Sequence, residues 1–568
     1  MTREAEKTMR RQQVLAQAVV PLAERIRSIE SEPLPDNISA LVRAAAAETA
    51  PEQVAWNFFE SGETMCYGDL CARIDSLATG MLDAGIAKGT HVGVMLPNIA
   101  AFPLTWLALA RVGAVMVPIN IAYTARELAY LVENGDVEQL VIHRECLAVL
   151  QEFEALREGI PAQRVHVVNT PSGTVPHAGS ALPDDTAGYG SWHALFMTAD
   201  SVRLNAIEVA LDDPMNIQYT SGTTGFPKGC ILSHRYWLIT SKVNAFRDGR
   251  VYRNIMAPTP FFYMDPQWLL LMAFHQRGTL HVAERQSPSR FMSWVREHDI
   301  NFCLFPYIIH KQPARPDDRQ HQLVRVNVYG IPKGIHQAME ERFDLIAREA
   351  FGMTETGTCM FMPIEATDMT GSGSCGMPGP FRRARIVDGH GAPVAPGDVG
   401  ELQVSGPGML QGYYKNPEAT AAAFDGEWFR TGDLFRQDER GYFYIVGRVK
   451  DMIRRAGENI AAREVEAVIA AIPEVAEAAA VPVKDDMRGE EVKVYIVLRK
   501  EFGMEDLPLT DLIAHCEANL ARFKVPRFIE YVEHLPKTPS GKIAKGTLVG
   551  SVSDLRRGSY DRIEEKWL

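Results

Sequence analysis

From about residue 63 the chain alternates between helical stretches and short apolar runs, and this alternation limits the folds that it can adopt. The helical stretches cover residues 67–84 and 101–111, and the apolar runs cover residues 92–96 and 114–118. Short runs rich in Val, Ile and Leu between amphipathic helices are typical of parallel strands joined by crossover helices. We therefore predict an α/β fold built on parallel sheets.

The pattern changes twice in the C-terminal part. Residues 373–444 contain frequent turns and short strands, which favour a small antiparallel or β-barrel-like subdomain. After this segment we predict helices 462–471 and 510–520 and strands 475–483, 492–498 and 527–531. The 568 residues also exceed what one hydrophobic core usually organises. We predict a large N-terminal domain of residues 1–446, a hinge at residues 447–451 and a smaller α+β C-terminal domain of residues 452–568.

Charge and composition disfavour several classes of protein. The net charge of -12, from 59 Lys and Arg and 71 Asp and Glu, argues against a nucleic-acid binder, which needs a basic surface. Residues 1–26 mix acids and bases without a long apolar core, so we expect an amphipathic helix rather than a secretory signal or a membrane span. Residues 171–190 have the composition of an exposed loop. The eight cysteines occur singly, and we interpret them as buried thiols of a cytoplasmic protein.

One loop carries the clearest functional signal. Residues 219–229 read YTSGTTGFPKG, with three glycines, four hydroxyl side chains and one lysine. Glycines let backbone N–H groups face an anion, hydroxyls add donors, and Lys228 supplies a positive charge. This composition suits a polyphosphate better than an ordinary surface turn. A Walker A loop is disfavoured, because Pro227 stands where a glycine is required and Gly229 follows the lysine.

Five further segments follow the loop in a fixed order. They are FGMTE (351–355), GELQVSGPGMLQGYYKNPEAT (400–420), WFRTGDL (428–434), YIVGRVKDMIRRAGENI (444–460) and PKTPSGKI (536–543). Each alone could be a turn or a solvated face. Together with the loop, in this order and at these separations, they resemble the adenylate-forming superfamily of acyl-CoA synthetases, peptide-synthetase adenylation domains and luciferases, over about residues 51–545.

The resemblance implies an ATP-dependent acid–CoA ligase. In such an enzyme a carboxylic acid and ATP give acyl-AMP and pyrophosphate, and CoA then gives acyl-CoA and AMP. A carboxylate needs this activation because its negative charge repels nucleophiles and an oxide oxygen is a poor leaving group. Cations and donors must offset the repulsion between the carboxylate and the triphosphate. The implied cofactors are therefore ATP, Mg²⁺ and CoA.

The resemblance also assigns roles in the nucleotide site. Thr354 would contact the α-phosphate, Glu355 would bind magnesium together with Thr224, Phe351 would stack on adenine in place of the usual tyrosine, and Asp433 would hold the ribose hydroxyls. Without the resemblance, Thr354 and Glu355 could cap a helix start and Asp433 could be a turn residue. The implied ATP-binding residues are Thr220, Ser221, Gly222, Thr223, Thr224, Gly225, Lys228, Phe351, Gly352, Asp433 and Arg448.

The resemblance further implies that the C-terminal domain is mobile. Lys542 would be catalytic together with Thr354 and Glu355, because it would reach between the carboxylate and the α-phosphate. The hinge residue would be Lys450. In a first pose Lys542 would enter the site, and in a second pose residues 454–459 would replace it and open a path for CoA. The implied CoA-binding residues are Arg454, Gly457 and Glu458.

The acid site departs from the common family pattern. Tyr263 replaces a frequent histidine, Ala462 replaces a usual proline, and residues 330–333 (GIPK) replace a small-residue pair. Within the family, the strings PFFYMDPQ, RQHQL and RRAGEN resemble the crotonobetaine/carnitine-CoA ligase branch. The expected acyl pocket contains Phe262, Tyr263, Asp265, Trp268, Tyr307, Tyr329, Gly330 and Met353. These aromatic rings and Asp265 could hold a quaternary ammonium group, or the rings could pack the core or line a pocket for an aryl or alicyclic acid.

Two other functions stay open. A stand-alone adenylation enzyme that loads a carrier protein in trans would share the adenylation residues and differ only in the thiol acceptor. A binding protein that keeps the fold without catalysis is disfavoured, because the residues implied for catalysis are intact. We expect a small carboxylic acid and CoA as partners, with no nucleic acid and no membrane span, and the sequence allows a homodimer.

Overall fold

The computed structural model describes residues 14–15, 17, 20–156, 160–170, 188–220, 227–331, 333–455, 458–485, 487–538, 541–550, 552 and 554–568. The chain divides into two compact units. Unit one comprises Met1–Thr220, Lys228–Arg383 and Ser405–Glu427, and unit two comprises Ser221–Pro227, Ala384–Val404 and Trp428–Leu568. The predicted hinge at residues 447–451 lies within unit two, so a division at the hinge stays a prediction.

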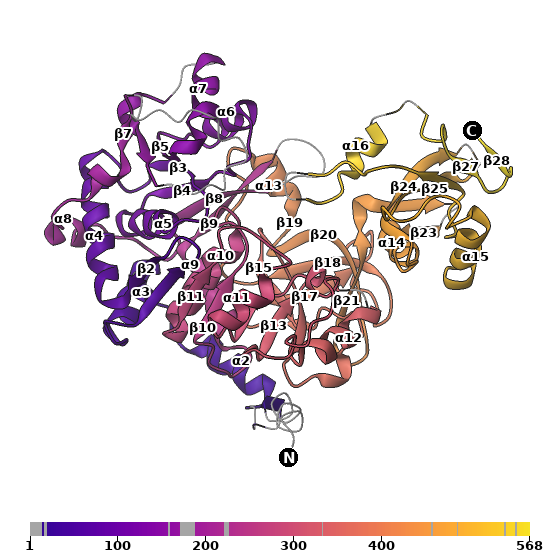
Figure 1. The fold of residues 1–568 in the computed structure, drawn as a ribbon, viewed down its shortest axis with the longest axis horizontal. Coiled ribbons are helices and arrows are strands. Elements are labelled where there is room, and N and C mark those ends of the chain that lie inside the picture. The colour runs from indigo at the N-terminus through magenta and orange to yellow at the C-terminus, as the bar shows by residue number, and fades with distance from the viewer. Residues whose placement is uncertain are drawn as a thin grey trace. The chain divides into compact units, whose positions relative to one another are not determined.

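A largely parallel sheet forms the first part of unit one (Figure 1). Its strand order is β7-β6-β5-β3-β4-β8-β9, and β8 and β9 pair antiparallel. The bounds are β3 His91–Met95, β4 Val115–Pro118, β5 Gln139–His143, β6 Val165–Val168, β7 Gly190–Ser191, β8 Pro214–Thr220 and β9 Lys228–Ser233. Its buried core includes Val117, Leu140 and Val165. The strands predicted at residues 92–96 and 114–118 are confirmed, whereas most of the loop predicted at residues 171–190 lies outside the described residues.

A second sheet completes unit one. Its order is β16-β15-β14-β13-β12-β10-β11-β1-β2, parallel from β14 to β1 and antiparallel at both edges. The bounds are β1 Val54–Phe58, β2 Glu63–Cys66, β10 Asn254–Ala257, β11 Thr279–Val282, β12 Phe302–Leu304, β13 Arg325–Val328, β14 Ile346–Met353, β15 Gly357–Phe361 and β16 Met377–Pro378. Trp294, Phe305 and Phe343 lie in the core beneath it. The predicted α/β class with parallel sheets is therefore confirmed.

Helices connect and cover these strands. In unit one they are α2 Leu22–Ser31, α3 Ile38–Ala47, α4 Tyr67–Asp83, α5 Ala101–Val112, α6 Ala125–Asn134, α7 Leu147–Leu156, α8 Ser201–Asn205, α9 His234–Phe246, α10 Met264–Gln276, α11 Phe291–Glu297, α12 Lys333–Phe343 and α13 Pro417–Ala423. Helices α4 and α5 confirm the predictions at residues 67–84 and 101–111. Helix α5 ends at Gly113, whose φ of 72° suits glycine. Helix α2 begins at Leu22. Within the predicted N-terminal helix, residues 14–15 are helical, and residues 1–13, 16, 18 and 19 lie outside the described part.

Unit two contains two sheets (Figure 1). In the first, β18 (Gly400–Ser405) pairs antiparallel with β20 (Trp428–Gln437), and β20 pairs antiparallel with β21 (Phe443–Arg448). Strand β17 (Arg383–Val387) lies beside β18. This half-barrel confirms the small β-barrel-like subdomain predicted from the turns.

The second sheet of unit two has the order β23-β22-β25-β26-β27-β28, with β24 on β25. Its elements are β22 Met452–Arg455, β23 Glu458–Ala461, α14 Ala462–Ala470, β24 Val475–Asp485, β25 Gly489–Leu498, α15 Leu509–Asn519, β26 Phe528–Tyr531, α16 Lys545–Gly550, β27 Tyr560–Asp561 and β28 Lys566–Trp567. Ile453, Val465, Val494 and Leu512 form part of its core. The helices and strands predicted after residue 460 are confirmed as a smaller α+β region.

The cysteines are all free thiols. Six are buried, but Cys66 and Cys71 are partly exposed. The prediction that the cysteines are buried is therefore correct for six of the eight.

Candidate active site

The predicted phosphate loop follows β8 and precedes β9. Thr220, the last residue of β8, lies opposite Lys228, the first residue of β9. The Thr220 hydroxyl donates to the Lys228 carbonyl at 3.4 Å, and the Lys228 side chain is exposed. The strands thus hold both ends of the predicted loop. Its other predicted residues lie outside the described part of the chain: Ser221, Gly222, Thr223, Thr224 and Gly225.

Thr354 and Glu355 occupy the turn of the hairpin between β14 and β15. Met353 lies opposite Gly357 across the hairpin, and the Thr356 N–H donates to the Met353 carbonyl at 3.1 Å. The alternative in which Thr354 and Glu355 cap a helix start is therefore wrong. The hairpin instead presents both side chains at the end of a parallel strand, where α/β folds commonly place ligands.

The same hairpin explains a glycine of the predicted ATP site. A Cβ atom at Gly352 would lie 2.5 Å from the Gly357 carbonyl oxygen, so a larger residue would force the strands apart. The preceding residue, Phe351, lies opposite Met360 and is half-buried. Phe351 therefore offers an aromatic side chain next to a glycine that has no side chain of its own, which suits stacking against a flat base.

Glu355 is held by two residues of the segment 400–420 to which the sequence analysis gave no role. The Tyr413 hydroxyl donates to Glu355 Oε1 at 3.1 Å, and the Leu410 N–H donates to the Glu355 carbonyl at 2.7 Å. The Lys228 Nζ atom lies 4.6 Å from the centre of the Tyr413 ring. The only sequence signal for Tyr413 was its place inside the segment GYYKNPEAT. Lys228 and Glu355, both predicted for the nucleotide site, thus share one neighbour.

Asp433 and Arg448 form an ion pair in unit two. They lie directly opposite each other on β20 and β21, and Arg448 Nε is 2.9 Å from Asp433 Oδ1. Asp433 is 2% exposed, whereas about half of the Arg448 side chain is exposed. Gly432, with a φ of 69°, turns the chain just before Asp433 and donates its N–H to Glu401 Oε1 at 3.2 Å. The predicted ribose acceptor is thus a buried carboxylate with a cationic partner.

The remaining predicted residues of unit two lie on exposed segments. Lys542 is exposed, and its N–H donates to Thr538 Oγ1 at 3.2 Å. Lys450 is exposed within the short 3-10 turn Val449–Asp451. Arg454 is exposed on β22, and its N–H donates to Glu490 Oε2 at 2.6 Å. For the other two predicted CoA-site residues, Gly457 lies outside the described residues and Glu458 is described only as the first residue of β23.

A clamp of three amide side chains fixes the turn that precedes Tyr263. Asn98 accepts from the Phe261 N–H at 2.7 Å and donates to two carbonyls. Gln218 donates to the Phe262 carbonyl at 2.9 Å, and Gln267 donates to the Phe261 and Tyr263 carbonyls. Sequence reasoning missed Asn98, Gln218 and Gln267. Because all three are buried and hydrogen-bonded, they hold the turn in one conformation.

Asp265, in the first turn of α10, carries a perturbed carboxyl group. Burial raises the pKa of Asp265 above its usual range, while a hydrogen bond from Trp268 Nε1 at 3.1 Å acts in the opposite direction. Burial, and secondly the Asp265 charge, raise the pKa of Tyr329. Tyr329 is nevertheless 52% exposed. Trp268 donates to Asp265, and the Asp265 charge acts on Tyr329, so these three predicted residues are neighbours.

The other residues predicted for the acyl pocket have separate contacts. The centres of the Phe262 and Tyr263 rings lie 4.7 Å apart. Gly330, with a φ of 64°, donates its N–H to Glu349 Oε2 at 3.1 Å. Met353 is half-buried at the end of β14.

Tyr307 has another neighbour. It is partly exposed, and Lys311 Nζ lies 4.8 Å from the centre of its ring. Among the described residues, no hydrogen bond, ion pair or ring contact joins Tyr307 to Asp265, Trp268 or Tyr329. A cation already faces the Tyr307 ring, so Tyr307 is poorly placed to bind a second one.

Beneath Tyr329 lies a buried charged cluster. Arg325 Nε is 3.2 Å from Asp248 Oδ2, and Arg247 Nη2 donates to Asn327 Oδ1 at 2.7 Å. Burial, and next the Arg325 charge, lower the pKa of Arg247 to about 10. These guanidinium groups are fully covered, so they cannot touch a substrate without rearrangement.

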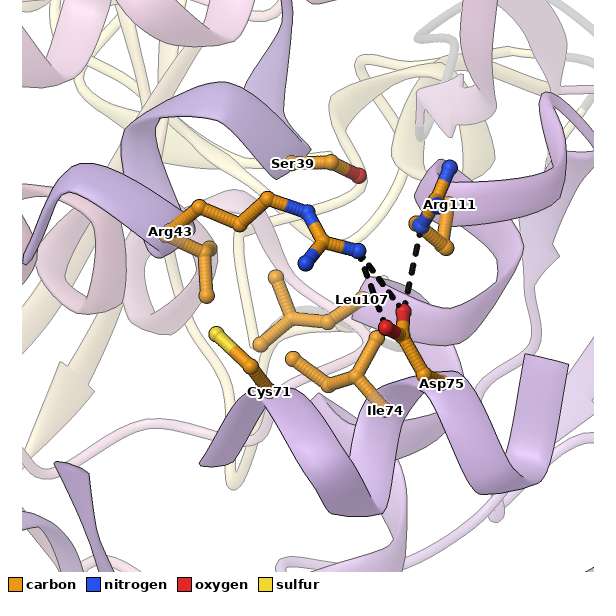
Figure 2. Close-up of a pocket in the computed structure, with 8 residues that line it drawn as sticks. Ser39, Arg43, Cys71, Ile74, Asp75, Leu107 and Arg111 are labelled. Carbon is orange, nitrogen blue, oxygen red and sulfur yellow. Dashed lines mark hydrogen bonds and ion pairs between the residues drawn. The ribbon is translucent and has the colours of Figure 1, made fainter. Parts of the chain in front are cut away.

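A small pocket lies elsewhere in unit one (Figure 2). Arg43 and Arg111 both bind the Asp75 carboxylate, at 2.9 Å and 3.1 Å, and Ser39 and Cys71 complete the polar lining. None of these residues was predicted for the site. The volume of about 10 Å³ is comparable with one water molecule. The pocket is therefore too small for a nucleotide or an acyl group, and Asp75 there links α3, α4 and α5.

The described residues contain neither a cluster of metal-binding side chains nor a membrane-spanning helix. In the described part of the chain, no three His, Cys, Asp or Glu side chains are grouped so that they could hold a metal ion. Over the same residues, no helix is long and apolar enough to cross a membrane.

The sequence matches known families and relatives over most of its length. Residues 43–414 match the AMP-binding enzyme family, and residues 464–542 match the AMP-binding enzyme C-terminal domain. A crotonobetaine/carnitine–CoA ligase from Salmonella paratyphi C (strain RKS4594) is 34% identical over 498 residues, which cover 85% of this chain and 92% of the relative. The enzyme of the same name from Salmonella typhi is 34% identical over 497 residues, with the same coverage.

Solved structures share the fold. ATP-bound MatB from Rhodopseudomonas palustris superposes with a TM-score of 0.77 at 24% identity, covering 92% of this chain and all of that one. The o-succinylbenzoate CoA synthetase from Bacillus subtilis, in complex with its acyl-adenylate intermediate, gives a TM-score of 0.75 at 22% identity, with 91% and 98% coverage. At these identities the likeness establishes the fold.

Proposed function

The chain belongs to the family of AMP-binding enzymes, among the acyl-CoA synthetases, and we propose that it joins a carboxylic acid to CoA in two steps. In the first step a carboxylate oxygen attacks the α-phosphorus of ATP, the bond from that phosphorus to the β-phosphate oxygen breaks, and pyrophosphate leaves. In the second step the CoA sulfur attacks the acyl carbon, AMP leaves with the bonding electrons, and the thiol proton passes to solvent. The family match over residues 43–414 is the observation that supports this proposal most strongly.

In the first step, residues at the start of β9 and at the end of β14 would bind the nucleotide. Lys228 would offer its charge to the β- and γ-phosphates together with the hydroxyls of the preceding loop. Thr354 would contact the α-phosphate from the hairpin turn, and Phe351 would stack on adenine. In unit two, Asp433 would accept hydrogen bonds from the ribose hydroxyls, and Arg448 would assist at ribose or phosphate.

Magnesium fits the donors that the chain offers. Mg²⁺ usually takes one or two protein carboxylates and fills its other positions with water and substrate phosphates. Glu355 offers one carboxylate, and the Thr224 hydroxyl is the second proposed ligand. An ion that arrives with ATP needs no preformed cluster of several carboxylates. When bound, Mg²⁺ would neutralise part of the triphosphate charge.

The second step would use a different face of the C-terminal region. We assign Lys542 to adenylation, because an exposed cation on a loop can stabilise the charge that develops at the α-phosphate. Arg454, Gly457 and Glu458 are assigned to CoA. Lys450 is the proposed hinge residue between the two poses, within a domain boundary at residues 447–451. The two poses would let one intermediate meet two sets of residues.

The acid that we propose is a betaine-type acid, which carries a quaternary ammonium group as well as the carboxylate. The relatives from Salmonella are named for such acids. In the present chain, Asp265 would face the cationic group and Trp268 and Tyr329 would offer ring faces. Within the described residues, the Asp265 side chain is reached by the Trp268 donor and by no ion pair with Lys or Arg. A carboxylate that is desolvated by burial and forms no such ion pair is well suited to a cationic ligand.

One experiment tests the proposed function. Purified enzyme is mixed with ATP, Mg²⁺ and a panel of acids, with and without CoA, and pyrophosphate, AMP and acyl-CoA are measured. We expect acid-dependent pyrophosphate release and, with CoA, an equal amount of acyl-CoA. Acyl-AMP that forms but is not consumed by CoA would instead favour a carrier protein as acceptor. No pyrophosphate release with any acid would contradict the proposal.

A homodimer and a cytoplasmic location stay predictions.

A further inference from the structure

Tyr413 contacts two proposed nucleotide-site residues that are far apart in the sequence. Its hydroxyl donates to Glu355 Oε1 at 3.1 Å, and Lys228 Nζ lies 4.6 Å from its ring centre. Tyr413 is 8% exposed and Glu355 is 9% exposed, so the hydrogen bond lies in the protein interior. The three residues belong to three different segments of unit one, and Tyr413 touches the other two.

The backbone around Tyr413 is anchored on both sides. The Tyr414 N–H donates to the Gly229 carbonyl at 2.8 Å, directly after the phosphate loop, and the Leu410 N–H donates to the Glu355 carbonyl at 2.7 Å. The ring of Tyr413 therefore has little freedom to move relative to either segment. A side chain fixed in this way can set the separation of its two neighbours.

We propose that Tyr413 is a positioning residue for the adenylation step, which holds the Glu355 carboxylate and the Lys228 ammonium group in the arrangement that receives magnesium and the polyphosphate. The inference rests on the proposed function, because it concerns the same nucleotide site. Carboxylates that bind metals are commonly oriented by a further hydrogen bond, and loss of such a partner typically weakens metal binding. Tyr413 would give Glu355 this partner.

The chemistry of a phenol suits both contacts. A phenol hydroxyl carries one proton to donate, and that of Tyr413 is directed to Glu355 Oε1. The ring attracts Lys228 through its quadrupole and carries no net charge. Unlike a carboxylate, the ring would orient the lysine without neutralising the charge that a phosphate needs. One neutral side chain can therefore place an anion for the metal and a cation for the phosphates.

The test uses Mn²⁺ as a paramagnetic substitute for Mg²⁺. Binding of Mn²⁺ to the full-length enzyme with ATP and no acid is followed by electron paramagnetic resonance, and the Mg²⁺ dependence of pyrophosphate release is measured separately. Tyr413→Phe removes the hydroxyl and keeps the ring, and Tyr413→Leu removes both. Tyr414→Phe is the matched control, because its hydroxyl donates to the exposed Asp136 at 2.7 Å instead. The reaction of presynthesised acyl-AMP with CoA reports on the fold and on the second step.

We expect Tyr413→Phe to weaken Mn²⁺ binding about tenfold or more and to raise the Mg²⁺ concentration needed for pyrophosphate release by a similar factor. Tyr413→Leu should also weaken ATP binding at saturating metal, because Lys228 loses its ring. Both variants should keep the second step, and Tyr414→Phe should match the wild type.

Three results would overturn the inference: wild-type Mn²⁺ binding in Tyr413→Phe, equal loss of both half-reactions in Tyr413→Phe, or absence of Mn²⁺ and ATP binding in the wild type. A different result would contradict the proposed function alone: the wild-type enzyme binds Mn²⁺ and ATP, but none of the acids in the panel causes pyrophosphate release. In that case the comparison of Mn²⁺ binding between Tyr413→Phe and the wild type would still decide the role of Tyr413.

Discussion

Asp433 and Arg448 face each other across β20 and β21, with 2.9 Å between Asp433 Oδ1 and Arg448 Nε. The carboxylate is buried, whereas the guanidinium group is half exposed. The buried charge of Asp433 is thus compensated by Arg448 without a nucleotide. A ribose would bring further donors to the same carboxylate, and Arg448 has room to turn toward a phosphate.

Asp433→Ala should weaken ATP binding. Two ribose hydroxyls would lose a charged acceptor, and each charge-assisted hydrogen bond is worth about 1.5–3 kcal/mol. We expect ATP affinity, measured by calorimetry, to fall by at least about tenfold. Asp398→Ala is the control, because Asp398 lies on an exposed turn of the same unit. An unchanged affinity in Asp433→Ala would leave Asp433 only its ion pair with Arg448.

Lys542→Ala should slow adenylation and spare thioester formation. Removal of one preorganised charge-stabilising donor typically costs about 10²–10³-fold in rate. Pyrophosphate release measures the first step, and the reaction of presynthesised acyl-AMP with CoA measures the second. Lys537→Ala is the matched control, because Lys537 lies in the same segment and pairs with Glu477 at 2.6 Å. Equal losses in both steps would argue against two poses.

Much of the fold followed from local patterns. Helices α4 and α5 and strands β3 and β4 were predicted because strands buried on both faces are short continuous apolar runs, which the longer helical stretches separate. The turn-rich half-barrel was predicted because its glycines and prolines have local conformational causes.

The site was predictable only where one residue carries its own chemical signal. Lys228 and Glu355 stand in motifs, so they could be selected singly. Tyr413 also stands in a motif, but the sequence does not show its contacts with Glu355 and Lys228, because folding brings these residues beside it. The same holds for Gln218 and Gln267, whose buried amides support the Tyr263 turn through long-range hydrogen bonds.

Lys450→Pro should separate the two half-reactions. Proline fixes φ near -65° and also restricts the preceding residue, so a hinge that must change its backbone angles would be trapped in one pose. If the adenylating pose is trapped, pyrophosphate release persists while transfer to CoA falls. Lys450→Ala controls for loss of the side chain alone. A proline variant that performs both steps at wild-type rates would place the hinge elsewhere.

Asp265 should make the use of betaine-type acids depend on pH. Burial raises the pKa of Asp265, so the carboxyl group stays protonated to a higher pH than an exposed aspartic acid. A cationic substrate needs the ionised form. We therefore expect kcat/KM for a betaine-type acid to rise as the pH increases through this raised pKa, while a neutral acid of similar size shows no such rise. Trp268→Phe should move the rise to higher pH, because it removes the donor that stabilises the carboxylate.

Asp265→Asn should abolish the rise of kcat/KM with pH and should lower kcat/KM for the cationic acid. Loss of one partner of a desolvated ion contact costs about 2–5 kcal/mol, so kcat/KM for betaine-type acids should fall by about 30-fold or more. The neutral acid is the internal control, because its kcat/KM should change much less in the same variant. If neutral aryl or alicyclic acids are good substrates of the wild type and betaines are not, Asp265 does not face a cation. Trp268 and Tyr329 would then line an apolar pocket.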